Sequence, residues 1–228
     1  MGDRSVDLIT QQESILPLIL MFISGLLLFI GILISIKKKD VAFSLVFLII
    51  GLIILSFVFP WWSLQGASQD VQTASDLYLL PFSFVSMTIA PQVMTGELSF
   101  VPEIFTTVMF VIPIVSFIVA LLLIIPLFIQ KALGKKWRLL LRIGSFVLIS
   151  GTMILFVVAM SAFAEVGVGS LIGQGTIDIS IQGEEGTSPL LCHWGPALGF
   201  WLYGTATILL VTLYLFQYKK KKQAEKLL

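Results

Sequence analysis

Five long apolar segments, each bounded by charged or polar residues, constrain this chain more than any other feature. Each is close to the length of about 20 apolar residues that crosses a hydrocarbon layer as a helix. Apolar residues make up 57% of the 228-residue chain and charged residues 12%, which leaves too little polar surface to cover a water-soluble domain. We therefore predict one membrane domain over 1–228, an all-α polytopic bundle of five transmembrane helices at about 15–36, 41–59, 104–129, 139–164 and 197–218.

The basic residues are confined to alternate connections between these segments. Residues 1–14 and the two long connections, 60–103 and 165–196, contain one basic residue, Arg4, and eleven acidic residues. The other thirteen of the fourteen Lys and Arg lie in or beside the short connections and in the tail. Because Lys and Arg accumulate in short cytoplasmic loops, we expect a multi-pass protein of the cell membrane. Its N-terminus would lie outside, its C-terminus in the cytoplasm, and both long loops would be exported.

Two segments of the exported loops alternate apolar and polar residues, which is the pattern of a half-buried strand. In the first loop the alternation covers 82–89. In the second it covers 176–182 and places Ile177, Ile179 and Ile181 on one face. We predict a small extracellular β-containing cap built from both loops. Pairing of the two segments with each other would make the cap one domain.

The predicted spans contain no Asp, Glu, His or Lys at mid-bilayer depth. Ionisable groups at that depth commonly mark ion paths and proton relays. Their absence argues against a proton-coupled transporter, a pump or an intramembrane hydrolase. The glycines at 167–175 lack the Gly-Lys-Ser/Thr of a phosphate-binding loop, and we interpret them as a flexible exit from the fourth span. We predict no enzymatic activity, no cofactor and no nucleic-acid partner.

Cys192-His193 is the one place where a thiol and an imidazole are adjacent. Zinc sites use three or four protein ligands, and the chain has no second Cys or His, although Glu184 or Glu185 could contribute. A nucleophile and its base must face each other, whereas neighbours in an extended segment point to opposite faces. We therefore predict neither a metal site nor a catalytic pair here.

Trp61 and Trp62 stand where the second span should end. Tryptophan is enriched at membrane–water interfaces and at the centres of protein–protein contacts, so these residues are either lipid anchors or a partner contact. The residues we predict as contacts for a partner are Trp61, Trp62, Ile177, Ile179, Ile181, His193 and Trp194.

The order of helices and loops from the second span onward resembles that of claudin-like four-helix membrane proteins. Trp61-Trp62-Ser63-Leu64 is the feature nearest to the claudin Gly-Leu-Trp loop signature, while both cysteines of that signature are missing. The first span at 15–36 is also outside the pattern. The resemblance covers about 41–218 and implies that the two loops combine into one extracellular sheet. If the segments 82–89 and 176–182 lie apart, the claudin-like interpretation fails.

These observations favour a non-enzymatic integral membrane protein, either a scaffold, an accessory subunit or a self-assembling unit. Its partners would be membrane lipid and another membrane protein or a second copy, contacted through exposed strand edges of the cap. One alternative is an oligomeric channel or transport component for uncharged or apolar solutes, lined by a third span kinked at Pro113. Another alternative is an enzyme that acts on lipid with the exported carboxylates.

Overall fold

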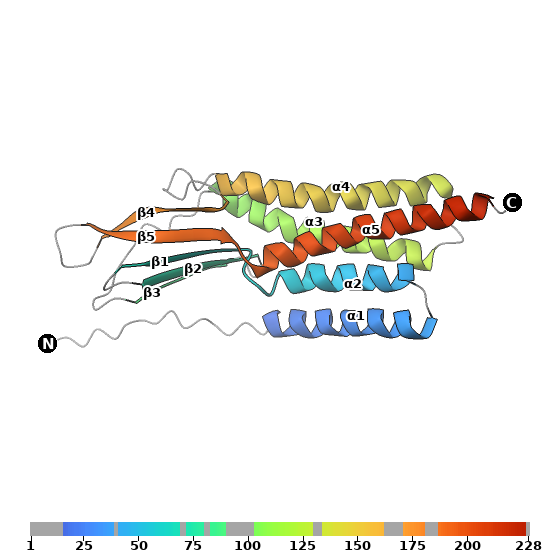
Figure 1. Cartoon of the computed structure of the whole chain (residues 1–228), viewed down its shortest axis with the longest axis horizontal. Coiled ribbons are helices and arrows are strands. Elements are labelled where there is room, and N and C mark those ends of the chain that lie inside the picture. The colour runs from blue at the N-terminus through green and yellow to red at the C-terminus, as the bar shows by residue number, and fades with distance from the viewer. Residues whose placement is uncertain are drawn as a thin grey trace.

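The computed structural model describes residues 16–38, 41–68, 72–79, 83–89, 103–129, 134–161, 171–180 and 187–226. Within these ranges the chain forms helices that run side by side and a sheet that extends from one end of them (Figure 1). The helices are α1 (Leu16–Lys38), α2 (Val41–Ser56), α3 (Glu103–Phe128), α4 (Lys135–Met160) and α5 (Leu198–Lys226).

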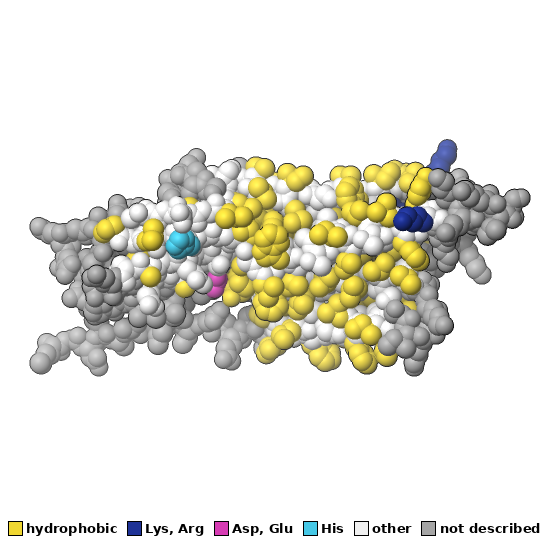
Figure 2. Space-filling view, in the orientation of Figure 1, with side chains coloured by type: hydrophobic (Ala, Val, Ile, Leu, Met, Phe, Trp, Pro, Cys, Tyr) yellow, Lys and Arg dark blue, Asp and Glu magenta, His cyan; other side chains and the backbone are white. Residues whose placement is uncertain are grey.

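Each of the five apolar segments contains a helix, as predicted, but α2 ends at Ser56, three residues before the predicted end at 59, and α4 ends at Met160, with 162–164 outside the described residues. Four helices, all except α2, are long and apolar enough to cross a membrane, which fits a membrane-embedded protein. Helix α2 has 16 residues, or about 24 Å at 1.5 Å per residue. Figure 2 shows apolar side chains spread over the helical part of the visible face. Helix α3 continues through Pro113 and Pro126, and the kink at Pro113 stays a prediction.

Helices α1 and α2 are antiparallel neighbours, as the short connection between them predicts (Figure 1). Small residues allow α1 and α2 to approach closely. The Ser44 hydroxyl of α2 donates a hydrogen bond to the Gly31 carbonyl of α1 at 2.6 Å. A Cβ on Gly51 would lie only 2.8 Å from the Leu28 side chain. The opposite side of α1 stays open, with Phe22 73% exposed. Close backbone approach through small residues is the usual way in which helices associate inside lipid.

The other helices are joined by buried hydroxyl groups. The Ser116 hydroxyl of α3 and the phenol of Tyr203 on α5 are hydrogen-bonded at 3.0 Å, with both side chains buried. Nearer the end away from the sheet, Ser145 of α4 and Tyr214 of α5 form a second bond between hydroxyls. Lipid offers no hydrogen-bond partner to these hydroxyl groups, so bonding to each other satisfies them and also holds neighbouring helices together.

The sheet is antiparallel and has the order β3-β2-β1-β5-β4. Its strands are β1 (Trp62–Ala67), β2 (Gln72–Tyr78), β3 (Ser83–Ile89), β4 (Gly173–Ser180) and β5 (Thr187–Pro196). The first connection therefore supplies three strands and the second supplies two. The central pair, β1 and β5, joins the two connections, with Trp62 opposite Pro196 and Ala67 opposite Leu191.

The predicted strands at 82–89 and 176–182 correspond to β3 and β4, apart from Phe82 and from 181–182, which lie outside the described residues. They do not pair with each other, because they form the two edges of the sheet. The loops nevertheless share one sheet through β1 and β5, strands that the alternation did not predict.

The residue Trp61 connects the sheet to the helices. Its backbone N–H donates to the Leu77 carbonyl of β2 at 2.7 Å, and its carbonyl accepts from the Ala197 N–H, just before α5, at 3.0 Å. The first turn of α5 presses against this joint, where a Cβ on Gly199 would lie 2.6 Å from the Phe59 and Ser56 carbonyl oxygens. Only a glycine allows that approach without a shift of backbone.

Candidate functional site

The central strands of the sheet have one buried and one open face. Alternate residues of β1, β2 and β5 are buried, as period-2 geometry requires. The buried set consists of Trp62, Leu64, Gly66, Thr73, Ser75, Leu77, Leu190, Cys192 and Trp194. The residues between them form the outer face, which we define as Ser63, Gln65, Ala67, Gln72, Ala74, Asp76, Tyr78, Leu191 and His193. A partner that meets the sheet from this side would contact the outer face.

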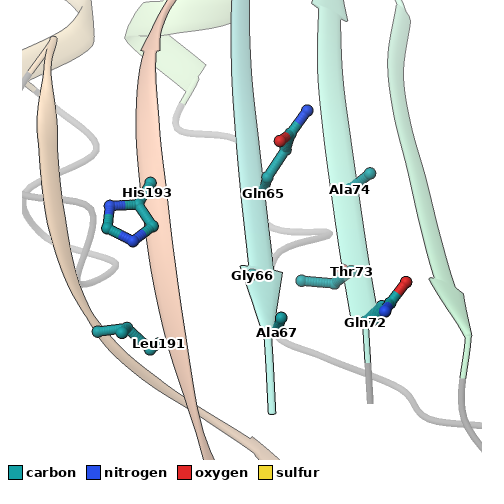
Figure 3. A pocket seen from close by; sticks show the side chains of 8 residues that line it. All are labelled: Gln65, Gly66, Ala67, Gln72, Thr73, Ala74, Leu191 and His193. Atoms are coloured by element: carbon teal, nitrogen blue, oxygen red, sulfur yellow. The ribbon is translucent and has the colours of Figure 1, made fainter.

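The outer face is hollowed where β1, β2 and β5 lie together. A hollow of about 430 Å³ is bordered by His193 and Leu191 from β5, Gln65 from β1 and Gln72 from β2 (Figure 3). His193 and Gln65 are direct cross-strand partners in the register. Small residues such as Ala74 make its floor. The hollow therefore presents amide groups, an imidazole and an exposed leucine, and the described residues that line it include no Asp, Glu, Lys or Arg.

The floor of the hollow depends on Gly66. On the buried side of the sheet, a Cβ at this position would lie 2.5 Å from Cys192 Sγ and 2.7 Å from Leu190 Cδ2. Packing from the neighbouring strand thus fills the space that a side chain would need. A substitution here would push β1 away from β5 and deform the hollow from below.

The charged part of the outer face lies beside the hollow rather than in it. Asp76 pairs with Ser63 in the register between β1 and β2. Burial raises the pKa of the Asp76 carboxyl above its ordinary value of 3.8. Burial, and secondarily the charge of Asp76, raises the pKa of the Tyr78 phenol. Within the described residues, no group of three or more His, Cys, Asp or Glu could hold a metal ion.

Cys192 and His193 lie on opposite faces of β5, as predicted. The thiol is fully buried, and this burial raises its pKa, whereas the imidazole is exposed on the outer face. The two groups cannot act as nucleophile and base on one substrate. Of the predicted contact residues, His193 is the one that the structure places at the hollow (Figure 3).

The three predicted tryptophans are interior residues rather than exposed contacts or lipid anchors. Trp61 and Trp62 are 0% and 1% exposed and Trp194 is 7% exposed. The Trp61 indole N–H donates to the Ser56 carbonyl at 2.9 Å, and the Trp62 indole N–H to the Leu171 carbonyl at 3.2 Å. Both indole N–H groups are thus hydrogen-bonded inside the protein, and neither ring is exposed to another protein in this conformation.

Two of the remaining predicted contacts, Ile177 and Ile179, belong to β4. Ile177 pairs with Leu190 and Ile179 with Ser188, while Ile181 lies outside the described residues.

Part of the glycine-rich segment is also strand rather than a flexible exit. Gly173 and Gly175 belong to β4 and lie under the Trp194 ring, which a Cβ on Gly173 would approach to 2.8 Å. Their missing side chains make room for the indole. Gly167 and Gly169 lie outside the described residues.

Sequence reasoning missed Gln65, Gln72 and Leu191, which border the hollow. The one signal for Gln65 was the alternation of apolar and polar residues over Trp62–Gln65, which stops at Gly66 and is short for a strand prediction. The comparisons, finally, return no match: no protein-family model, no curated protein and no solved structure is similar to this chain.

Proposed function

We propose that this chain is a non-enzymatic membrane subunit that contacts another protein through the outer face of its sheet. The observation that carries the proposal is the hollow between His193, Gln65, Gln72 and Leu191, whose described lining residues include no Asp, Glu, Lys or Arg. Gln side chains both donate and accept hydrogen bonds, which suits the amide groups of a protein surface. An exposed leucine, 55% accessible, adds apolar area at the same place. A charged small molecule would find no Asp, Glu, Lys or Arg to pair with among the described residues that line the hollow.

The proposed placement has five crossings, with the sheet outside the cell and the far end of the helices in the cytoplasm. The visible Lys and Arg side chains of the described residues lie at the helix ends away from the sheet (Figure 2). That distribution supports a cytoplasmic position for those ends. Helix α2 would cross with Phe57, Val58 and Phe59 completing its apolar length. The claudin-like layout stays a prediction: both loops join in one sheet through β1 and β5, but 82–89 and 176–182, whose pairing that layout was expected to require, lie at opposite edges of the sheet.

A photocrosslinking experiment tests the contact. A benzophenone amino acid replaces Gln65 at the hollow, and in a matched chain it replaces Trp137, which is 63% exposed on α4 at the opposite end. We expect a discrete product of higher mass only from position 65. A product of twice the mass would identify a second copy, and any other mass a different protein.

A charge variant completes the test. His193→Glu places a carboxylate on the rim, and we expect it to remove the crosslink from position 65 because an uncharged contact would have to bury it. Equal products from positions 65 and 137, or an undiminished product in the His193→Glu chain, would refute the proposal.

A further inference from the structure

A second hollow lies at the other end of the molecule, between α4 and α5. Helix α4 packs mainly on α3, and α5 packs mainly on α2. The two helices therefore leave a groove of about 1210 Å³ between them. This volume exceeds the roughly 300–1,000 Å³ typical of sites for drug-sized ligands. We call this space the α4–α5 groove.

The α4–α5 groove changes character along its length. At the end away from the sheet it is lined by Lys136 and Arg142 of α4 and by Gln217 and Tyr218 of α5. Deeper along the helices its walls are apolar, for example Phe146 on α4 and Val211 on α5. Ten residues separate Lys136 from Phe146, a rise of about 15 Å. That is about half of a 30 Å hydrocarbon core, so the groove has the depth of one lipid leaflet.

The polar end of the groove is positive and has an unused acceptor. Lys136 and Arg142 carry two positive charges, and none of the described residues that line the groove has a carboxylate. The N-terminus of α4 begins at Lys135 without a side-chain cap, which adds the positive end of the helix dipole. Gln217 Oε1 is buried and has no hydrogen-bond partner in the described part of the chain. An acceptor in that situation favours a ligand that brings a donor group.

We propose that the α4–α5 groove binds one anionic phospholipid whose headgroup carries a hydroxyl, such as phosphatidylglycerol. The phosphodiester would lie between Lys136 and Arg142, the headgroup hydroxyl would donate to Gln217 Oε1, and an acyl chain would lie along Phe146 and Val211. Basic pockets between membrane helices suit such headgroups. This site requires membrane embedding but is independent of any partner at the sheet.

The test uses the full chain purified in mild detergent. Native mass spectrometry counts bound lipid, and thermal unfolding measures protection by phosphatidylglycerol, by phosphatidylcholine with the same acyl chains, and by inorganic phosphate. We expect one tightly bound phosphatidylglycerol and a raised Tm with that lipid alone. Protection by inorganic phosphate alone would indicate a free-anion site, and equal protection by phosphatidylcholine would indicate non-selective coating; either result overturns the proposal.

Variants separate the charges from the groove itself. We expect Lys136→Gln with Arg142→Gln to weaken phosphatidylglycerol binding at least tenfold. Val211→Trp fills the apolar part of the α4–α5 groove and keeps both cations, and it should also weaken phosphatidylglycerol binding at least tenfold. Lys219→Gln is the matched control, because Lys219 is exposed and does not line the groove, and it should bind within twofold of the native chain.

If the double variant does not fold, the single variant Lys136→Gln can be compared with the native chain instead. Lys136 is exposed, so its single replacement by Gln leaves the helix packing intact. That variant and Val211→Trp then decide the matter. Native affinity in both, or equal losses in Lys136→Gln and Lys219→Gln, would refute the site.

Discussion

Replacing Trp61 should release the sheet from the helices. The indole is fully buried, and its ring centroid lies 5.0 Å from that of Tyr203 and 5.1 Å from that of Phe156. Phe57 and Phe200 complete the surround at 6.4 and 6.1 Å. Truncation of a buried Trp to Ala costs about 3–5 kcal/mol. Trp61→Phe keeps a ring and loses mainly the indole hydrogen bond, so we expect about 1–2 kcal/mol for that variant.

The single cysteine of the chain supplies the assay. Cys192 is fully buried within the sheet, and it is the only cysteine in the sequence. A maleimide therefore reacts only when the sheet opens, and its rate follows the open population. Because about 1.4 kcal/mol is a tenfold change, a loss of 3 kcal/mol should raise the labelling rate of Trp61→Ala more than a hundredfold in detergent at fixed pH.

The control is a tryptophan of opposite environment. Trp137 is 63% exposed, so Trp137→Ala should change the rate by less than about threefold, in line with ordinary surface substitutions. We expect Cys192 to be labelled fastest in Trp61→Ala, more slowly in Trp61→Phe, and most slowly in the native chain. Labelling of Trp61→Ala within twofold of the native rate would show that the joint at Trp61 does not hold the sheet in place.

Three further results are expected. Gly199→Ala should lower the unfolding free energy by about 1–3 kcal/mol, because its Cβ would meet two carbonyl oxygens at 2.6 Å. Gly151→Ala, with no atom within 4 Å of the added Cβ, should leave the unfolding free energy unchanged or raise it by up to about 1 kcal/mol, because alanine is the better helix former. Denaturant titration compares the two variants. Burial raises the folded pKa of Asp76, so stability should fall as pH rises from its unfolded pKa through the folded one, and Asp76→Asn should remove that slope; a slope that persists in Asp76→Asn would contradict this. A double-mutant cycle of Ser116→Ala and Tyr203→Phe should give a coupling free energy of about 0.6 kcal/mol for the hydrogen bond between the two side chains. If the two losses of unfolding free energy simply add, this bond does not stabilise the fold.

Most helix positions follow from the apolar segments, but three helix ends do not. Helix α4 begins at Lys135, not 139, α5 continues past 218 to Lys226, and α2 ends at Ser56, not 59. An apolar segment shows which residues suit lipid, whereas lysine is a good helix former that extends a helix into water. For α4 and α5 the prediction therefore located the apolar part of the helix and missed its polar continuation, whereas in α2 the helix ends before its apolar segment does.

The strands were harder to predict because packing interrupts their alternation. In β1 the third inward position is Gly66, which pattern reading does not count as apolar. In β5 the neighbours Leu190 and Leu191 are both apolar although one is buried and the other exposed. The burial of the tryptophans could not be predicted for a similar reason. Trp61 becomes an interior residue only when both loops meet in one sheet, and the local sequence does not show that meeting. The α4–α5 groove arises from which helices pack together, and no single helix sequence specifies that.

The central β1–β5 pair has a consequence for biosynthesis. Trp62 leaves the ribosome long before its partner Pro196, so β1 must wait through the synthesis of two whole helices with one hydrogen-bonding edge vacant. Edges of that kind attract other strands, and distant pairings form late. A nascent chain halted between α4 and β5 should therefore aggregate more readily than the complete chain, because it exposes the edge of β1 that β5 later covers.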